Sequence, residues 1–158
     1  MSNDTDSVKT RLQSDLTAAM KARDEVALST IRMLRAAIMN AEVAGDEAVE
    51  LTDEQTITVL QSEAKKRAES AAVYQENDRP ESAAKERAEL EIIERYLPAA
   101  MSDDDLAAIV DQEVAAAAAN GAEGGKAMGM VIKAVRDRAG ASADGARIAA
   151  LVKARLAG

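Results

Sequence analysis

The stretch TDEQTITVLQSEAKKRAESAAVYQE (residues 52–76) predicts the longest helix of the chain. It opens with a capping box, in which Thr52 accepts a hydrogen bond from the backbone of Gln55 and the Gln55 side chain reaches back. Apolar side chains then recur every three or four residues as far as Tyr74, which is the period of an α-helix. The sequence NDRP (residues 77–80) breaks this helix and places Pro80 at the first position of the next one.

The composition extends the helical prediction to the whole chain of 158 residues. There are 36 alanines against 30 valines, isoleucines and leucines together, and alanine is the strongest helix former. Residues typical of strands are scarce, since the only aromatic side chains are two tyrosines. We therefore predict an all-α fold whose helices approach one another through small side chains.

Breaks in the apolar pattern divide the chain into four long helices followed by three shorter ones. The helices are expected at about residues 6–23, 25–44, 52–76, 80–97, 102–119, 126–139 and 144–156. Asp24, Ser102 and Asp144 are predicted N-caps, and Gly45 is the predicted end of the second helix. Because the residue before a proline is pushed out of helical geometry, Pro98 marks a boundary between a lobe of residues 1–97 and a lobe of residues 98–158.

The absence of cysteine and histidine excludes several classes of function. Thiol catalysis, Cys/His zinc sites, disulfides and every catalytic triad with a histidine base are ruled out. No pair of carboxylates lies in a recognisable catalytic motif, so we expect neither a catalytic centre nor a cofactor or metal. The run Asp103–Asp105 is expected to complement the helix dipole, because successive helical residues point about 100° apart and do not converge on one ion.

Charge is distributed unevenly along the chain, whose net charge is −8. From residue 121 onward there are seven basic and three acidic side chains, a net +4, so residues 1–120 sum to −12. Such asymmetry is typical of a surface that contacts phosphates, and the alternative is a solvated helix surface with cations near helix C-termini. The seven candidate RNA-binding residues are Lys126, Lys133, Arg136, Arg138, Arg147, Lys153 and Arg155.

Smaller basic groups have simpler interpretations. Arg32 and Arg35 lie beside the apolar stripe of the second helix, and we predict that they pair with acids such as Glu63 or Glu89, with an anion site as the alternative. Residues 65–67 (KKR) are predicted to be a solvated face. The GGK at residues 124–126 lacks the spacing of a Walker phosphate loop and is predicted to be a flexible link.

Two further features of the sequence indicate where the protein is located. The first six residues do not have the pattern of a signal peptide, and the longest apolar run, residues 115–119, is far shorter than the ~20 residues that span a membrane. We therefore expect a cytoplasmic protein that does not enter membranes.

Several ordered segments carry a resemblance to a known family. They are LTAAMKARD (16–24), LSTIRMLRAAI (28–38), LTDE (51–54), KKRAES (65–70), ELEIIE (89–94), YLP (96–98), GKAMG (125–129) and ADG (143–145). Together they resemble the GatB/YqeY family, in particular its small free-standing YqeY-like proteins. The link between the last two helices looks about four residues longer than is usual in the family, so the resemblance does not extend to contacts made by that turn.

The resemblance implies two helical subdomains and kinship with the C-terminal tail of the B subunit of the tRNA-dependent Asp/Glu amidotransferase. That tail helps to hold the body of the tRNA and does not contain the glutaminase or kinase centres. We therefore expect a helical accessory protein that contacts tRNA, or a tRNA-bound enzyme, through its basic C-terminal lobe. One alternative is a protein-interaction module with no RNA role. The other is a component of a carbon–nitrogen ligase that uses glutamine as amido donor.

Overall fold

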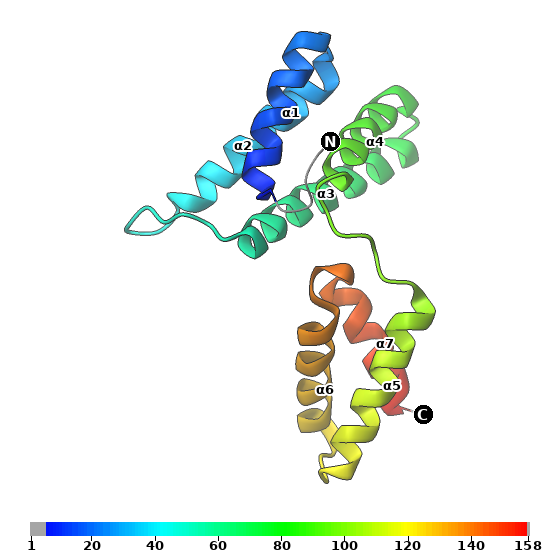
Figure 1. The fold of residues 1–158 in the computed structure, drawn as a ribbon. Helices are drawn as coiled ribbons and strands as arrows, with labels where there is room; N and C mark the ends of the chain where they lie inside the picture. Colours follow the sequence, from blue (N-terminus) through cyan, green and yellow to red (C-terminus); the bar gives the residue numbers. More distant parts are fainter. Residues whose placement is uncertain (1–5, 158) are drawn as a thin grey trace. The chain divides into compact units, whose positions relative to one another are not determined.

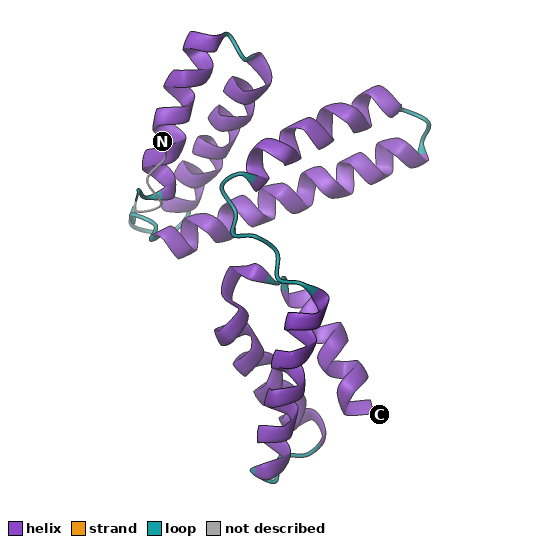
Figure 2. Cartoon of the chain, turned by 45° about the vertical axis from the view of Figure 1, so that its right-hand side comes forward, coloured by secondary structure: helices purple, strands orange, loops and turns teal. Residues whose placement is uncertain are grey.

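The computed structural model describes residues 6–157, and this part of the chain contains seven α-helices and no strand (Figures 1 and 2). The predicted all-α fold is confirmed. Residues 1–5, which include most of the segment judged to lack a signal peptide, lie outside the described part. The helices are α1 (Val8–Ala22), α2 (Glu25–Glu42), α3 (Asp53–Glu76), α4 (Pro80–Glu94), α5 (Asp103–Ala119), α6 (Gly124–Ala139) and α7 (Gly145–Ala157), and a 3-10 turn, η1 (Gly140–Ser142), precedes α7.

The predicted caps are present at the helix N-termini. The Gln55 amide donates to Thr52 Oγ1 over 3.2 Å, and the Thr52 amide donates to Gln55 Oε1 over 2.9 Å, which completes the capping box of α3. Asp24 and Ser102 accept from backbone amides of α2 and α5 in the same way. The Arg147 amide donates to Asp144 Oδ1 over 2.8 Å at the start of α7.

Several helix boundaries differ from the prediction: α1 begins at Val8 rather than near residue 6, and α4 ends at Glu94 rather than near residue 97. Helix α2 ends at Glu42 rather than near residue 44, because the Glu42 carbonyl accepts a hydrogen bond from the Val49 amide over 2.9 Å and the loop folds back there. Gly45 consequently does not close the helix in a left-handed conformation, whereas Arg23 does so at the end of α1 with φ 57°. Helix α6 begins at Gly124, before the predicted start, with φ 60° at that residue, so residues 124–126 form its first turn and the predicted flexible link is wrong there.

The contacts between helices divide the chain into two compact units, residues 1–97 and 98–158. The first unit consists of two helical hairpins, α1–α2 and α3–α4, in which consecutive helices run side by side (Figures 1 and 2). Its core is aliphatic and is completed by one aromatic ring, Tyr96, which follows α4. The fully buried large side chains of this core are Leu12, Leu34, Leu60 and Ile93.

The second unit packs α5, α6 and α7 against one another around a separate core. Branched side chains from all three helices meet there, and small ones such as Ala117 and Ala139 fill the gaps between them. The fully buried members are Leu106, Val110, Val131, Val135, Ile148 and Val152. The Met101 amide donates to the Ser142 carbonyl over 2.7 Å, which ties the chain before α5 to η1.

Candidate functional site

Three of the candidate RNA-binding arginines connect helices of the second unit. The Arg138 guanidinium donates from α6 to Glu113 Oε1 over 3.0 Å and to Gln112 over 2.8 Å. On α7, Arg155 binds Asp111 over 2.7 Å and Arg147 binds Asp103, both on α5. The charges of these arginines therefore already face acidic partners, and the pairs link α6 and α7 to α5.

A strip of basic side chains lies along the outer surface of α6. Lys126 and Lys133 are seven residues apart, which places them on the same face two turns apart, and Arg136 follows one turn later. All three side chains are exposed. Lys133 forms an ion pair with Asp137 over 3.2 Å, but both side chains are more than two-thirds exposed, so this pair contributes little and leaves the lysine accessible. We call Lys126, Lys133 and Arg136 the α6 strip.

The position of Arg136 depends on a glycine in the next helix. Its guanidinium lies so close to Gly145 that a Cβ atom there would collide with it. Within residues 6–157, Arg136, Lys126 and Lys153 have no acidic partner. Lys153 is exposed on α7 and is not part of the strip.

Arg67 lies at the centre of an acidic cluster in the first unit. Its guanidinium is 3.1 Å from Glu89, 3.5 Å from Glu63 and 3.7 Å from Glu86, and its side chain is only 17% exposed. It also contacts the Met33 sulfur. The prediction that residues 65–67 form a solvated face is therefore wrong for Arg67, which joins α3 to α4.

Arg32 and Arg35 do not pair with Glu63 or Glu89, because Arg67 occupies that position. Both are exposed on α2 and have no acidic partner among the described residues. They border a groove of about 420 Å³ between α1 and α2, whose exposed apolar side is formed by Ala36 and Met39 over the buried Leu12 and Ile38.

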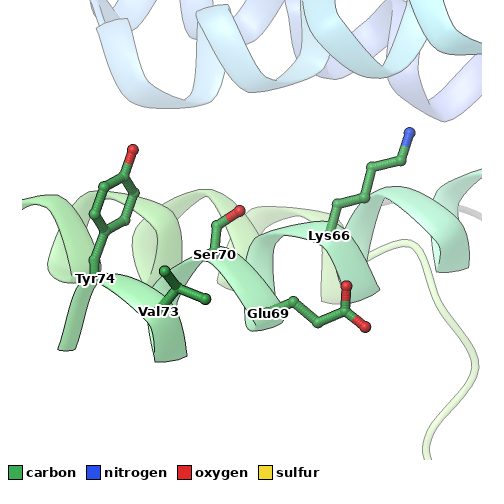
Figure 3. Close-up of a pocket in the computed structure, with 5 residues that line it drawn as sticks. All are labelled: Lys66, Glu69, Ser70, Val73 and Tyr74. Carbon is green, nitrogen blue, oxygen red and sulfur yellow. The ribbon is translucent and has the colours of Figure 1, made fainter. Parts of the chain in front are cut away.

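A second hollow of about 380 Å³ lies on α3 (Figure 3). It is lined by side chains of this helix alone, which are Lys66, Glu69, Ser70, Val73 and Tyr74. The Tyr74 ring is also 4.9 Å from the Arg79 guanidinium, a cation–π contact at the hairpin turn. Lys66 pairs with Glu63, which does not line this hollow, over 2.9 Å.

A polar network surrounds Tyr96 at the end of the first unit. The tyrosine hydroxyl donates to Asp15, and the Arg11 guanidinium lies 5.2 Å from the ring centre and donates to the Arg95 carbonyl over 3.0 Å. Burial, and then the hydrogen bond to Asp15, raise the pKa of Tyr96 above the ordinary tyrosine value. The network holds α1 against the chain that follows α4.

Metal-binding clusters are not found among residues 6–157. The predicted dipole role of the acidic run at the start of α5 agrees with its position in the first turn, where Asp103 also binds Arg147. In the same part of the chain no helix is long and apolar enough to cross a membrane.

A protein-family comparison accounts for nearly the whole chain. The model of the family described as "Yqey-like protein" matches residues 9–156, from the start of α1 to the end of α7. The chain belongs to the YqeY-like family. The resemblance seen in the sequence is thus confirmed.

Two curated relatives of this YqeY-like protein have the same name, "Altered inheritance of mitochondria protein 41, mitochondrial". The one from Pyrenophora tritici-repentis is 26% identical over 132 residues, which cover 82% of this chain and 71% of the relative. The one from Meyerozyma guilliermondii is 35% identical over 92 residues, which cover 58% of this chain and 47% of the relative.

These names contradict the expected cytoplasmic location. Both relatives are named as mitochondrial proteins. The expectation rested on the absence of a signal-peptide pattern and on short apolar runs, which exclude membrane spans but do not distinguish one aqueous compartment from another. The cytoplasmic assignment is therefore withdrawn.

Proposed function

We propose that this YqeY-like protein is a non-catalytic helical accessory protein that contacts tRNA, or an enzyme bound to tRNA, through its three-helix unit. In this proposal the four-helix and three-helix units act as separate lobes. The observation that carries it is the α6 strip, three exposed cations on one helix surface of a chain with net charge −8.

The geometry of the strip suits contact with a phosphate backbone. Lys126 and Arg136 are ten residues apart, so the strip is about 15 Å long at 1.5 Å per residue. Cations in such a row attract phosphates without reading bases. The only aromatic residues, Tyr74 and Tyr96, lie before the second unit, so that unit has no ring on which to stack an unpaired base. Backbone contact with folded RNA is the mode that remains.

The ion pairs narrow the set of candidate residues. Arg138, Arg147 and Arg155 serve the packing of the second unit, since each connects a helix to α5. The proposed contact therefore rests on the α6 strip, with Lys153 on α7 as a separate unpaired cation.

Filter binding of tRNA to strip variants tests the proposal. Lys126→Gln, Lys133→Gln and Arg136→Gln should each weaken binding, and each lost phosphate contact should lower the slope of log affinity against log salt by about one. The triple variant should lose nearly all binding at physiological salt. Circular dichroism checks that the variants are folded.

Arg155→Gln is the matched control, because it removes the same charge from the same unit at a side chain already paired with Asp111. It should leave the salt slope unchanged. If Arg155→Gln weakens binding as much as the strip variants, or if the wild-type chain binds tRNA no better than an unrelated acidic helical protein, the RNA proposal is wrong. If tRNA binding fails in either of these ways and a protein partner is still captured after nuclease treatment, the protein-interaction alternative is favoured.

A further inference from the structure

The groove between α1 and α2 combines an apolar surface with unpaired positive charge. Ala36 and Met39 contribute exposed apolar side chains, with Met39 62% exposed, above the buried Leu12. Four charged side chains line the same groove, which are Lys9, Arg32, Arg35 and Glu42. Its volume of about 420 Å³ falls within the usual range for small-molecule sites.

The negative charge in this groove is already neutralised. Glu42 accepts hydrogen bonds from Lys9 and from the Leu51 amide, the latter over 3.1 Å. These bonds, with that to Lys9 the stronger influence, lower the pKa of Glu42 below its ordinary value and keep it ionised and paired. The two arginines therefore give the groove a net charge of +2.

That charge is unexpected in its surroundings. Residues 1–97 contain 20 acidic and 13 basic side chains, a net −7. Arg32 and Arg35 lie three residues apart on one helix face, where like charges repel, and no described carboxylate compensates them. Two guanidinium groups beside an apolar surface form a fitting site for a molecule with an anionic head and an apolar body.

We propose that this groove binds a small amphiphilic organic anion, with its phosphate or carboxylate held by Arg32 and Arg35 and its apolar part against Ala36 and Met39. The guanidinium groups donate forked hydrogen bonds to the anionic head. Gln13, which also lines the groove, supplies a further polar side chain. The site lies in the first unit and does not depend on the proposed RNA contact of the second.

Amide NMR titration of the full-length chain tests the proposal with four probes, which are hexyl phosphate, hexanoate, inorganic phosphate and hexanol. Hexyl phosphate or hexanoate should give saturable shifts at the groove residues and bind more tightly than both inorganic phosphate and hexanol, since each of the latter lacks one half of the ligand. Comparison of the two amphiphilic probes identifies the preferred head group. Arg35→Gln should weaken binding about tenfold, and Arg32→Gln combined with Arg35→Gln should abolish it.

Lys21→Gln is the control for net charge, because Lys21 is exposed on α1 and does not line the groove. Its affinity should equal that of the wild type. The proposal is overturned if neither amphiphilic probe gives saturable shifts, if the double arginine variant binds as the wild type does, or if Lys21→Gln weakens binding equally. Since the substituted side chains are exposed, we expect every variant to fold, and circular dichroism checks this.

Discussion

Tyr96 gives the first unit a buried polar contact in an otherwise aliphatic core. The residue is only 5% exposed, and its hydroxyl donates to Asp15, which is itself half-buried. A buried hydroxyl without a partner is costly, so this bond favours one position of α1 relative to the end of α4.

Replacing Tyr96 by phenylalanine should lower the free energy of unfolding by about 1 kcal/mol at neutral pH, the typical contribution of one such bond. The loss stays modest because the ring is kept and water can reach Asp15. Urea unfolding followed by circular dichroism measures it. An unchanged stability would mean that the bond contributes nothing.

The raised pKa of Tyr96 also predicts a response to alkali. Above the ordinary tyrosine pKa of about 10, the unfolded chain loses a proton that the folded chain still holds. The free energy of unfolding should therefore fall as the pH rises from there, and it should fall less in Tyr96→Phe. Urea titrations of both proteins between about pH 8 and about pH 11 compare the two slopes. Parallel slopes would contradict the prediction.

Arg67 holds together three glutamates that would otherwise repel one another. Its substitution by methionine keeps an unbranched side chain but leaves Glu86 and Glu89 without a cation, while Glu63 keeps its pair with Lys66. Because the cluster is partly exposed, we expect a loss of about 2 kcal/mol, below the range for fully buried pairs.

Lys65→Met is the matched control, since it removes one charge from an exposed neighbour on the same helix. Its effect on the urea midpoint should be small. Equal destabilisation by the two substitutions would show that net charge, rather than the cluster, matters.

The sequence pattern contained an indication of this role. Arg67 is seven residues after the buried Leu60 and four before the buried Ala71, so helical periodicity places it beside the apolar face of α3. The identity of its partners was not predictable in the same way. Glu86 and Glu89 belong to α4, and their approach depends on how the hairpin folds back.

At the level of elements, helix starts with a side-chain cap or a proline were predictable because these signals are local, whereas α6, which has no side-chain cap, begins before its predicted start. Thr52, Pro80 and Ser102 act within three or four residues of themselves, and each begins its helix as expected. Helix ends depend on more distant partners. The end of α2 is set by a hydrogen bond from Val49, across a loop whose path the pattern of α2 does not encode.

The cap of α7 provides a prediction at this scale. Asp144→Ala should lower the free energy of unfolding of the second unit by about 1 kcal/mol, because the Arg147 amide loses its acceptor. Asp144→Asn keeps a capping oxygen and should be close to the wild type. Thermal unfolding by circular dichroism measures both. A loss that is equal in the two variants would assign the effect to charge rather than to capping.

At the level of the whole molecule, the two units have separate hydrophobic cores. We therefore predict that Tyr96→Phe increases amide exchange in α1–α4 alone and that Asp144→Ala does so in α5–α7 alone. Hydrogen exchange with mass spectrometry resolves the two groups of helices. Spread of either effect across both units would show that the chain unfolds as one cooperative body.

The candidate site was only partly predictable for the same reason. The spacing of Lys126, Lys133 and Arg136 along one helix is visible in the sequence, so their common face could be inferred. The partners of Arg138, Arg147 and Arg155 lie 25 to 44 residues away on α5, and only the packing of three helices reveals them. The groove beside Arg32 and Arg35 likewise exists only once α1 and α2 are paired.

The last turns of α5 suggest a practical use. Of the five consecutive alanines at residues 115–119, only Ala117 is buried. A single cysteine introduced at position 118 would be the chain's only thiol, since the sequence contains none of its own. A fluorophore or photoreactive group attached there should leave the core undisturbed and would capture whatever molecule approaches the second unit in a living cell.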